Sequence, residues 1–204
     1  MSTFRQLITR IALAAARRAG IRVARVVVRP LEGSPQPAAP DAIRCRLVKE
    51  AELRLWSFDP ALQLNEAQLR SAFERGDVCV GAFDRWRLVG YEWLGFRATP
   101  HAAGLWVQFR PSDCYMYKTF VHPAYRGLGI AGLLNAAGNE IAARHQRERV
   151  ICFIDLKNSA SWQAAKRSGS FTAGYVGYIA CFGRAIAFRT AGASRQGFRF
   201  SALS

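Results

Sequence analysis

Acidic side chains are scarce in this 204-residue chain, which has 14 aspartates and glutamates against 29 lysines and arginines. The formal net charge of +15 favours polyanionic partners, such as a phosphate-bearing cofactor, nucleic acid, anionic lipid or an acidic protein. Nucleic acid is the weakest of these interpretations, because no interleaved basic-aromatic motif and no nucleic-acid-binding fold signature occurs. Long uninterrupted apolar runs are also missing, so no transmembrane helix is expected.

Histidines and cysteines at the regular spacing of metal sites or disulfide frameworks are missing as well. The chain has three histidines and five widely separated cysteines, namely Cys45, Cys79, Cys114, Cys152 and Cys181. Most of these cysteines lie in apolar runs, and no C-x-x-C or Cys/His spacing occurs. The pattern predicts reduced core thiols, no metal site and a reducing, cytoplasmic location.

Residues 1–29 contain seven arginines and no acidic residue, and Phe4, Leu7, Ile8 and Ile11 recur at helical spacing. This pattern predicts a basic amphipathic helix, for which three interpretations stay open. It is a peripheral anchor to an anionic membrane or acidic partner, a targeting segment, or a helix packed on the domain. Four prolines in residues 30–41 then predict a stiff linker, which places the globular domain at residues 42–204.

Within residues 42–204, short β-branched and aromatic runs alternate with amphipathic segments, which predicts an α/β fold with a mixed sheet. The expected strands are residues 43–48, 78–84, 87–97, 114–121, 150–155, 171–181 and 185–190. The expected helices are residues 50–56, 66–75, 127–146 and 159–168. Residues 98–113 are expected to form an irregular excursion with a short strand near residues 105–109.

Residues 120–134, FVHPAYRGLGIAGLL, read as a strand that stops at a proline, a short glycine-containing loop and a helix. Gly127 and Gly129 have no Cβ, so backbone N–H groups there can approach a ligand closely. The free donors and the positive dipole end of a helix N-terminus add to this arrangement, as does the guanidinium of Arg126. The segment therefore predicts an anion cradle for a phosphate or pyrophosphate. The G-K-[ST] and G-x-G-x-x-G patterns of other nucleotide loops are missing.

The same segment resembles the acyl-CoA-binding motif of the GNAT superfamily of N-acetyltransferases. The family pattern Q/R-x-x-G-x-G/A is matched by Arg126, Gly129 and Ala131. Downstream, Asn158 and Ser161, followed by the G-S-F run at residues 169–171, resemble the second family motif, N-x-x-S/A…G-F. The resemblance covers roughly residues 43–190.

The resemblance implies a GNAT fold in which strands 114–121 and 150–155 splay apart to admit the pantetheine arm of acetyl-CoA or another acyl-CoA. That arm would bond to the backbone of Phe120 and Val121, and Asn158 would face the arm or the leaving thiol. The pyrophosphate would rest on backbone amides of Arg126, Gly127, Leu128, Gly129, Ile130 and Ala131. A small-molecule amine would then attack the thioester directly.

Two departures from the family pattern affect the acid–base half of the site. The position of the frequent thiolate-protonating tyrosine falls on Ala165, and Ser170 separates Gly169 from Phe171. Two other residues are therefore predicted as catalytic, with Glu92 as the base and Tyr117 as the phenol that protonates the thiolate. For Glu92 the alternative is a structural pair with Lys118 or an arginine. Two alternative functions also stay open, namely a CoA-binding module without turnover and an acyltransferase that uses an acidic acyl-carrier protein.

Overall fold

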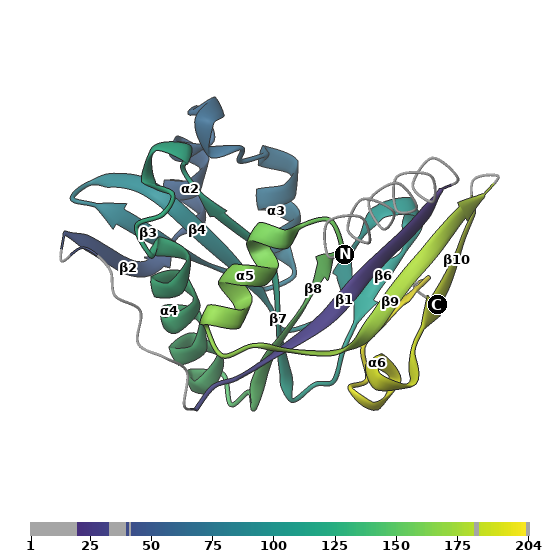
Figure 1. Ribbon diagram of the computed structural model, residues 1–204. Coiled ribbons are helices and arrows are strands. Elements are labelled where there is room, and N and C mark those ends of the chain that lie inside the picture. Colours follow the sequence, from purple (N-terminus) through teal and green to yellow (C-terminus); the bar gives the residue numbers. More distant parts are fainter. Residues whose placement is uncertain (1–19, 33–39, 41, 182–183, 203–204) are drawn as a thin grey trace, which may run out of the picture.

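A computed structural model describes residues 20–32, 40, 42–181 and 184–202. An eight-stranded mixed sheet runs through the molecule in the order β10-β9-β1-β8-β7-β4-β3-β2 (Figure 1). Its strands are β1 (Ile21–Pro30), β2 (Ile43–Val48), β3 (Val78–Asp84), β4 (Arg87–Gly95), β7 (Asp113–Val121), β8 (Arg149–Asp155), β9 (Phe171–Cys181) and β10 (Arg184–Arg189). A smaller sheet, in the order β11-β6-β5, contains β5 (Thr99–Pro100), β6 (Trp106–Gln108) and β11 (Arg199–Ser201).

Helices cover both faces of the main sheet. They are α2 (Glu50–Trp56), α3 (Glu66–Glu74), α4 (Ile130–Arg144), α5 (Ser159–Arg167) and α6 (Ala191–Arg195), with 3-10 turns at Pro60–Leu62, Ala102–Gly104 and Pro123–Tyr125. None of the described helices is long and apolar enough to cross a membrane. The predicted α/β fold with a mixed sheet is confirmed, and the expected helices and strands of residues 43–190 are present within a few residues of their predicted ends.

Side-chain alternation along β4 separates the two faces of the sheet. Tyr91 and Trp93 pack with α2 and α3 on one face, whereas Leu94 packs with Ile130 and Leu134 of α4 on the other. Figure 1 shows α4 and α5 side by side on the same face of the sheet. A residue of this sheet can therefore reach α3 or α4, but not both.

Among the described strands of the main sheet, β7 and β8 form the only parallel pair, and they pair only over their first residues. Their register runs from Asp113 opposite Arg149 to Tyr115 opposite Ile151, although β7 continues to Val121. A bulge in the pairing of β7 with β4 adds one residue, Tyr117, between the partners of Trp93 and Leu94. Since a bulge bends its strand and increases the local twist, β7 turns away from β8 here. The predicted splay of these two strands is confirmed.

The N-terminal prediction requires a correction. Residues 21–30 form β1, which lies between β8 and β9 and pairs antiparallel with both. Val26, Val27 and Val28 are each at most 1% exposed, so burial of each side chain contributes about 1.5–3 kcal/mol to folding. A domain that begins at residue 42 is therefore wrong, because it omits a central strand.

The physical reason for this error lies in the composition of β1. Its isoleucine and valines favour a strand. Its arginines, however, extend the arginine-rich pattern of the preceding residues, so the sequence pattern predicts one basic helix over residues 1–29. Residues 1–19 lie outside the described residues, so the amphipathic helix and its anionic membrane or acidic partner stay predictions. Most of the proline-rich linker, residues 33–39 and 41, also lies outside them, and Pro30 is the last residue of β1.

Arg29 anchors β1 to β4 and to α4. Its side chain is 3% exposed, and its Nη2 lies 3.9 Å from Oε1 of Glu92 on β4. The guanidinium also donates to Oδ1 of Asn139 at 2.8 Å and to the backbone carbonyl of Asn135 at 3.3 Å, both on α4. One buried cation thus connects the N-terminal strand to α4 and to the opposite half of the sheet.

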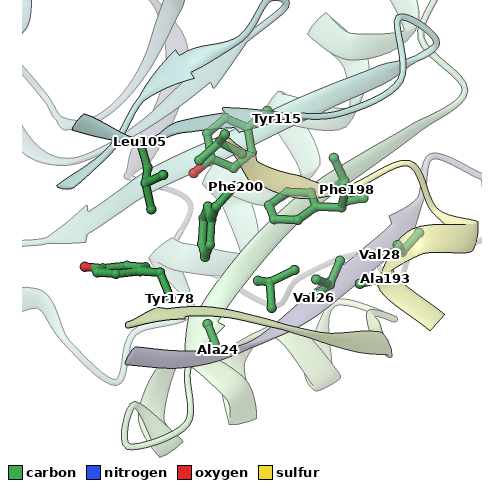
Figure 2. Close-up of a cluster of buried hydrophobic side chains, with 12 residues drawn as sticks. Ala24, Val26, Val28, Leu105, Tyr115, Tyr178, Ala193, Phe198 and Phe200 are labelled. Carbon is green, nitrogen blue, oxygen red and sulfur yellow. The ribbon is translucent and has the colours of Figure 1, made fainter. Parts of the chain in front are cut away.

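The C-terminal segment, which was not predicted, closes the other face of the sheet. Residues of β11 pair antiparallel with β6, and Phe198 and Phe200 pack among side chains from β1, β6, β7 and β9. Figure 2 shows Phe198 and Phe200 beside Tyr115, with Val26 and Val28 of β1 on the opposite side of the cluster. This cluster fixes the position of the Tyr115 ring, which stacks on Tyr117 of the site described below.

A matched pair of variants tests the role of Arg29. Arg29→Met leaves the buried Glu92 carboxyl without its cation, so the free energy of unfolding should fall by about 3–5 kcal/mol. Arg144 and Glu140 lie at a similar distance, 3.8 Å, but their side chains are 74% and 72% exposed. Arg144→Met should therefore cost less than about 1 kcal/mol. Denaturant unfolding measures both, and equal losses would contradict the anchoring role of Arg29.

Candidate active site

A cavity of about 620 Å³ opens where β7 and β8 separate, and we call it the gap cavity. Its walls come from β7, β8, the loop before α4, and the helices α4 and α5. Six of the predicted cofactor residues line it, namely Val121, Arg126, Gly127, Ile130, Ala131 and Asn158. The strands thus bring together two motifs that are well separated in the sequence.

The loop before α4 has free backbone donors at the mouth of this cavity. Gly127 and Gly129 adopt left-handed φ values of 85° and 76°, which glycine reaches without steric cost. The first bonds into α4 are donated by the N–H groups of Gly132 and Leu133 to the Gly129 carbonyl. Among the described contacts, the amides of residues 127–131 therefore have no protein acceptor, which fits the predicted anion cradle.

Arg126 lies at the edge of the cradle. Its Nε donates to the Val121 carbonyl at 3.3 Å, which holds the guanidinium over the end of β7. Leu128 and Gly129 belong to the same loop but do not line the gap cavity. Their predicted contribution through backbone amides stays a prediction.

The backbone of β7 distinguishes Phe120 from Val121. The His122 N–H donates to the carbonyl of Val89 on β4, so His122 and Val89 form a hydrogen-bonded pair of the antiparallel ladder. Because such pairs alternate along antiparallel strands, Phe120 directs its backbone to β4 and Val121 directs its backbone into the gap. The Phe120 ring stacks on Tyr91 at 5.3 Å on the α3 face and does not line the gap cavity. The geometry supports the predicted backbone contact at Val121 and does not support one at Phe120.

Asn158 and Asn135 present amides to the gap cavity from two helices. Oδ1 of Asn158 caps α5 by accepting from the Ser161 N–H at 3.0 Å. Asn135, which sequence reasoning missed, donates through Nδ2 to Ser168 Oγ at 2.9 Å. Its Oδ1 is buried with no hydrogen-bond partner, although Asn135 lines the cavity. A buried acceptor without a partner is costly, so this oxygen fits an amide or hydroxyl donor of a ligand.

A second cavity, of about 680 Å³, lies on the α3 face of the sheet, and we call it the aromatic cavity. Its walls come from α3, β4, β7, β8 and the segment around His101. Three residues line both cavities, namely Tyr117, Lys118 and Phe153. The two cavities therefore share a wall of side chains where β7 and β8 separate.

Tyr117 lies at this junction and belongs to a chain of polar groups. Its hydroxyl donates to Oδ2 of Asp77 at 3.0 Å, and Arg75 Nη2 lies 2.6 Å from the same oxygen. Burial raises the pKa of the Asp77 carboxyl, and the charge of Arg75 opposes that rise. Burial and the Asp77 charge raise the pKa of Tyr117 above its ordinary value, so the phenol stays protonated near neutral pH. No local sequence signal marked Asp77.

Glu92 does not have the position that its predicted role requires. Its side chain is fully buried on the α4 face, where it lies near Gly138 and Arg29 and accepts from Thr119 Oγ1 at 3.1 Å. It lines neither cavity. Burial raises the pKa of Glu92, but the same burial removes the carboxyl from any acceptor. The geometry matches the alternative interpretation of Glu92, a structural pair with an arginine.

Comparison with solved structures finds the same fold in proteins of low sequence identity. A GCN5-related N-acetyltransferase from Sphaerobacter thermophilus is similar with a TM-score of 0.56 at 16% identity, over 88% of this chain and 55% of that chain. A functionally unknown protein from Staphylococcus epidermidis has a TM-score of 0.57 at 13% identity, over 81% of this chain and 64% of its own. This chain thus spans less than two thirds of the length of either protein.

A third similar structure contains a bound ligand. AAC(6')-Iy in complex with the bisubstrate analogue CoA-S-monomethyl-acetylneamine is similar with a TM-score of 0.51 at 17% identity, over 62% of this chain and 89% of that chain. At these identities the structures show a shared fold. No curated protein matches the sequence.

Family membership rests on the sequence itself. The model of the acetyltransferase (GNAT) family matches residues 46–169, which is more than half of the chain and includes the cradle, both separated strands and α5. With the fold, the separated strands and the cradle in agreement with that match, the chain belongs to the GNAT acetyltransferase family.

Proposed function

We propose that this protein transfers an acetyl or other acyl group from acyl-CoA to the amine of a small molecule. The observation that carries the proposal is that Tyr117 lines two cavities, one with an anion cradle and one with aromatic walls. A transferase that uses direct attack needs both reactants close together, and two cavities that share wall residues where β7 and β8 separate fit that requirement.

On the donor side, the free amides of residues 127–131 and the Arg126 guanidinium fit the pyrophosphate of CoA. The backbone of Val121 and the Oδ1 of Asn135 fit the amides of the pantetheine arm. When bound, acyl-CoA supplies an activated thioester. The chain's own residues orient that arm and exclude water from the gap.

On the acceptor side, Tyr117 and Asp77 replace Glu92 in the proposal. A proton that leaves the amine nitrogen can pass to the Tyr117 oxygen while the Tyr117 proton passes to Asp77. The raised pKa of Asp77 makes its carboxylate a better proton acceptor than an exposed aspartate. The same two groups can return the proton to the departing thiolate, which retains the predicted role of Tyr117 as the phenol.

The cradle assignment predicts a selective loss of CoA binding. Gly127→Asp introduces a side chain and a negative charge at the pyrophosphate position. Saturation with CoA at about 100 times its dissociation constant should stabilise the wild-type protein by about 2.7 kcal/mol, and the variant should lose most of this gain. Thermal unfolding with and without CoA measures the difference.

Gly76 provides a matched control for the strain of this substitution. Gly76 and Gly127 have φ values of 80° and 85°, and in both cases an added Cβ meets nothing within 4 Å. Gly76→Asp should therefore cost similar stability without CoA but keep the full CoA-induced gain. Retention of that gain by Gly127→Asp would show that the cradle lies elsewhere.

Proton transfer through Tyr117 and Asp77 predicts that substitutions of Tyr117 and of Glu92 differ in their effect on turnover. Tyr117→Phe keeps the ring but removes the hydroxyl, so kcat should fall by about 10²–10⁴-fold with CoA affinity unchanged. Glu92→Gln should leave kcat within about threefold, because Glu92 lines neither cavity. Steady-state thiol release measures kcat, and CoA titration measures affinity. A large loss in Glu92→Gln alone would restore Glu92 as the base.

Asp77 should determine the acidic limb of the pH profile. Its pKa is raised, so its carboxylate is protonated and unable to accept a proton as the pH falls through that value. We expect kcat to decrease toward low pH at a midpoint above the ordinary aspartate value of about 3.9. In Asp77→Asn, kcat should be low throughout and this limb should be missing. An unchanged limb in the variant would assign it to another group.

A further inference from the structure

We propose that the acceptor of this enzyme is an aromatic amine with a single positive charge, and that polycationic amines are excluded. The inference rests on the proposed function and concerns the aromatic cavity alone. It also separates this chain from AAC(6')-Iy, the similar structure with an acetylneamine analogue bound.

Stacked rings form the walls of the aromatic cavity. Trp93, Tyr117 and Tyr115 form a continuous stack, with centroids 6.1 Å and 5.7 Å apart and interplanar angles of 23° in both pairs. Phe153 continues it, since its ring lies 6.4 Å from Tyr115 at 19°. This row of nearly parallel rings offers edges and faces against which a flat apolar body can pack. A volume of about 680 Å³ is within the usual range for small-molecule sites.

The charge of the cavity favours a weakly charged ligand. No aspartate or glutamate is among the described residues that line it, whereas two cationic residues, Arg75 and Lys118, line it. Burial lowers the pKa of His101, a third lining residue, so its imidazole is neutral at pH 7. A ligand with several ammonium groups would meet two cations and no lining carboxylate, so its lost hydration would not be repaid.

One carboxylate lies just behind the wall, and its capacity is limited. Asp77 is 2% exposed, and its carboxylate already accepts hydrogen bonds from the Arg75 guanidinium and the Tyr117 hydroxyl. It can take up one proton through Tyr117 when an amine attacks. It cannot neutralise a second or third ammonium group, which would have to lie among the rings or beside Lys118. The site therefore serves one amine per ligand.

Direct binding measurements test this inference without turnover. Isothermal titration of the full chain, with and without saturating CoA, compares tryptamine with kanamycin as probes. We expect tryptamine to bind at least tenfold more tightly than kanamycin. Kanamycin binding as tight as tryptamine, or no detectable binding of tryptamine, would overturn the proposal. The CoA-induced thermal shift tests the proposed function separately, so the two can fail independently.

A charge variant tests the cause of the selectivity. Gln68 is an exposed residue of α3 that lines the aromatic cavity, so Gln68→Glu adds the carboxylate that the cavity lacks. Kanamycin affinity should rise at least threefold in this variant, and the ratio of tryptamine to kanamycin affinity should fall. Gln146, just beyond α4, is exposed and lines neither cavity. Gln146→Glu makes the same change in net charge and should leave both affinities unchanged. An equal response of the two variants would assign the selectivity to the overall charge and overturn the proposal.

Discussion

The site depends on one constraint, which is the failure of β7 and β8 to remain paired. Three residues of each strand are in register, and the bulge at Tyr117 then turns β7 away. Each unpaired strand leaves backbone donors and acceptors that need partners, and a buried segment of this kind is costly unless a ligand or side chain supplies them. The gap therefore explains why the backbone of Val121 faces away from β4, why a cavity forms here, and why three residues line cavities on both faces.

The rest of the fold holds this gap open. Arg29, from a strand outside the matched family region, connects β1 to Glu92 and α4 directly beside the cavity. On the opposite face, Phe198 and Phe200 from the end of the chain support Tyr115, and Tyr115 stacks on Tyr117 (Figure 2). The strand β1 and the segment around Phe198 thus stabilise a site that the middle of the chain forms. The buried charges Arg29, Asp77, Glu92 and Asp113 are each paired with an opposite charge.

The predictability of each element follows from how local its signal is. The cradle could be predicted because its glycines and Arg126 are adjacent in the sequence and meet in one loop. The strand β1 could not, since arginines interrupt its valines and its partners β8 and β9 lie far along the chain. Glu92 is buried with a raised pKa, which fits both of its predicted interpretations, and only the identity of its neighbour, Arg29, separates a structural pair from a base. Asp77 gains its role through Tyr117, a contact that no local pattern indicates.

The central claim is direct acyl transfer between the two cavities. The most direct measurement is mass spectrometry of a reaction of the full chain with ¹³C-labelled acetyl-CoA and an aromatic monoamine. The account predicts that the label appears on the amine, that free CoA forms in equal amount, and that the mass of the protein stays unchanged. Label that accumulates on the protein, or CoA release that is the same with and without the amine, would contradict it.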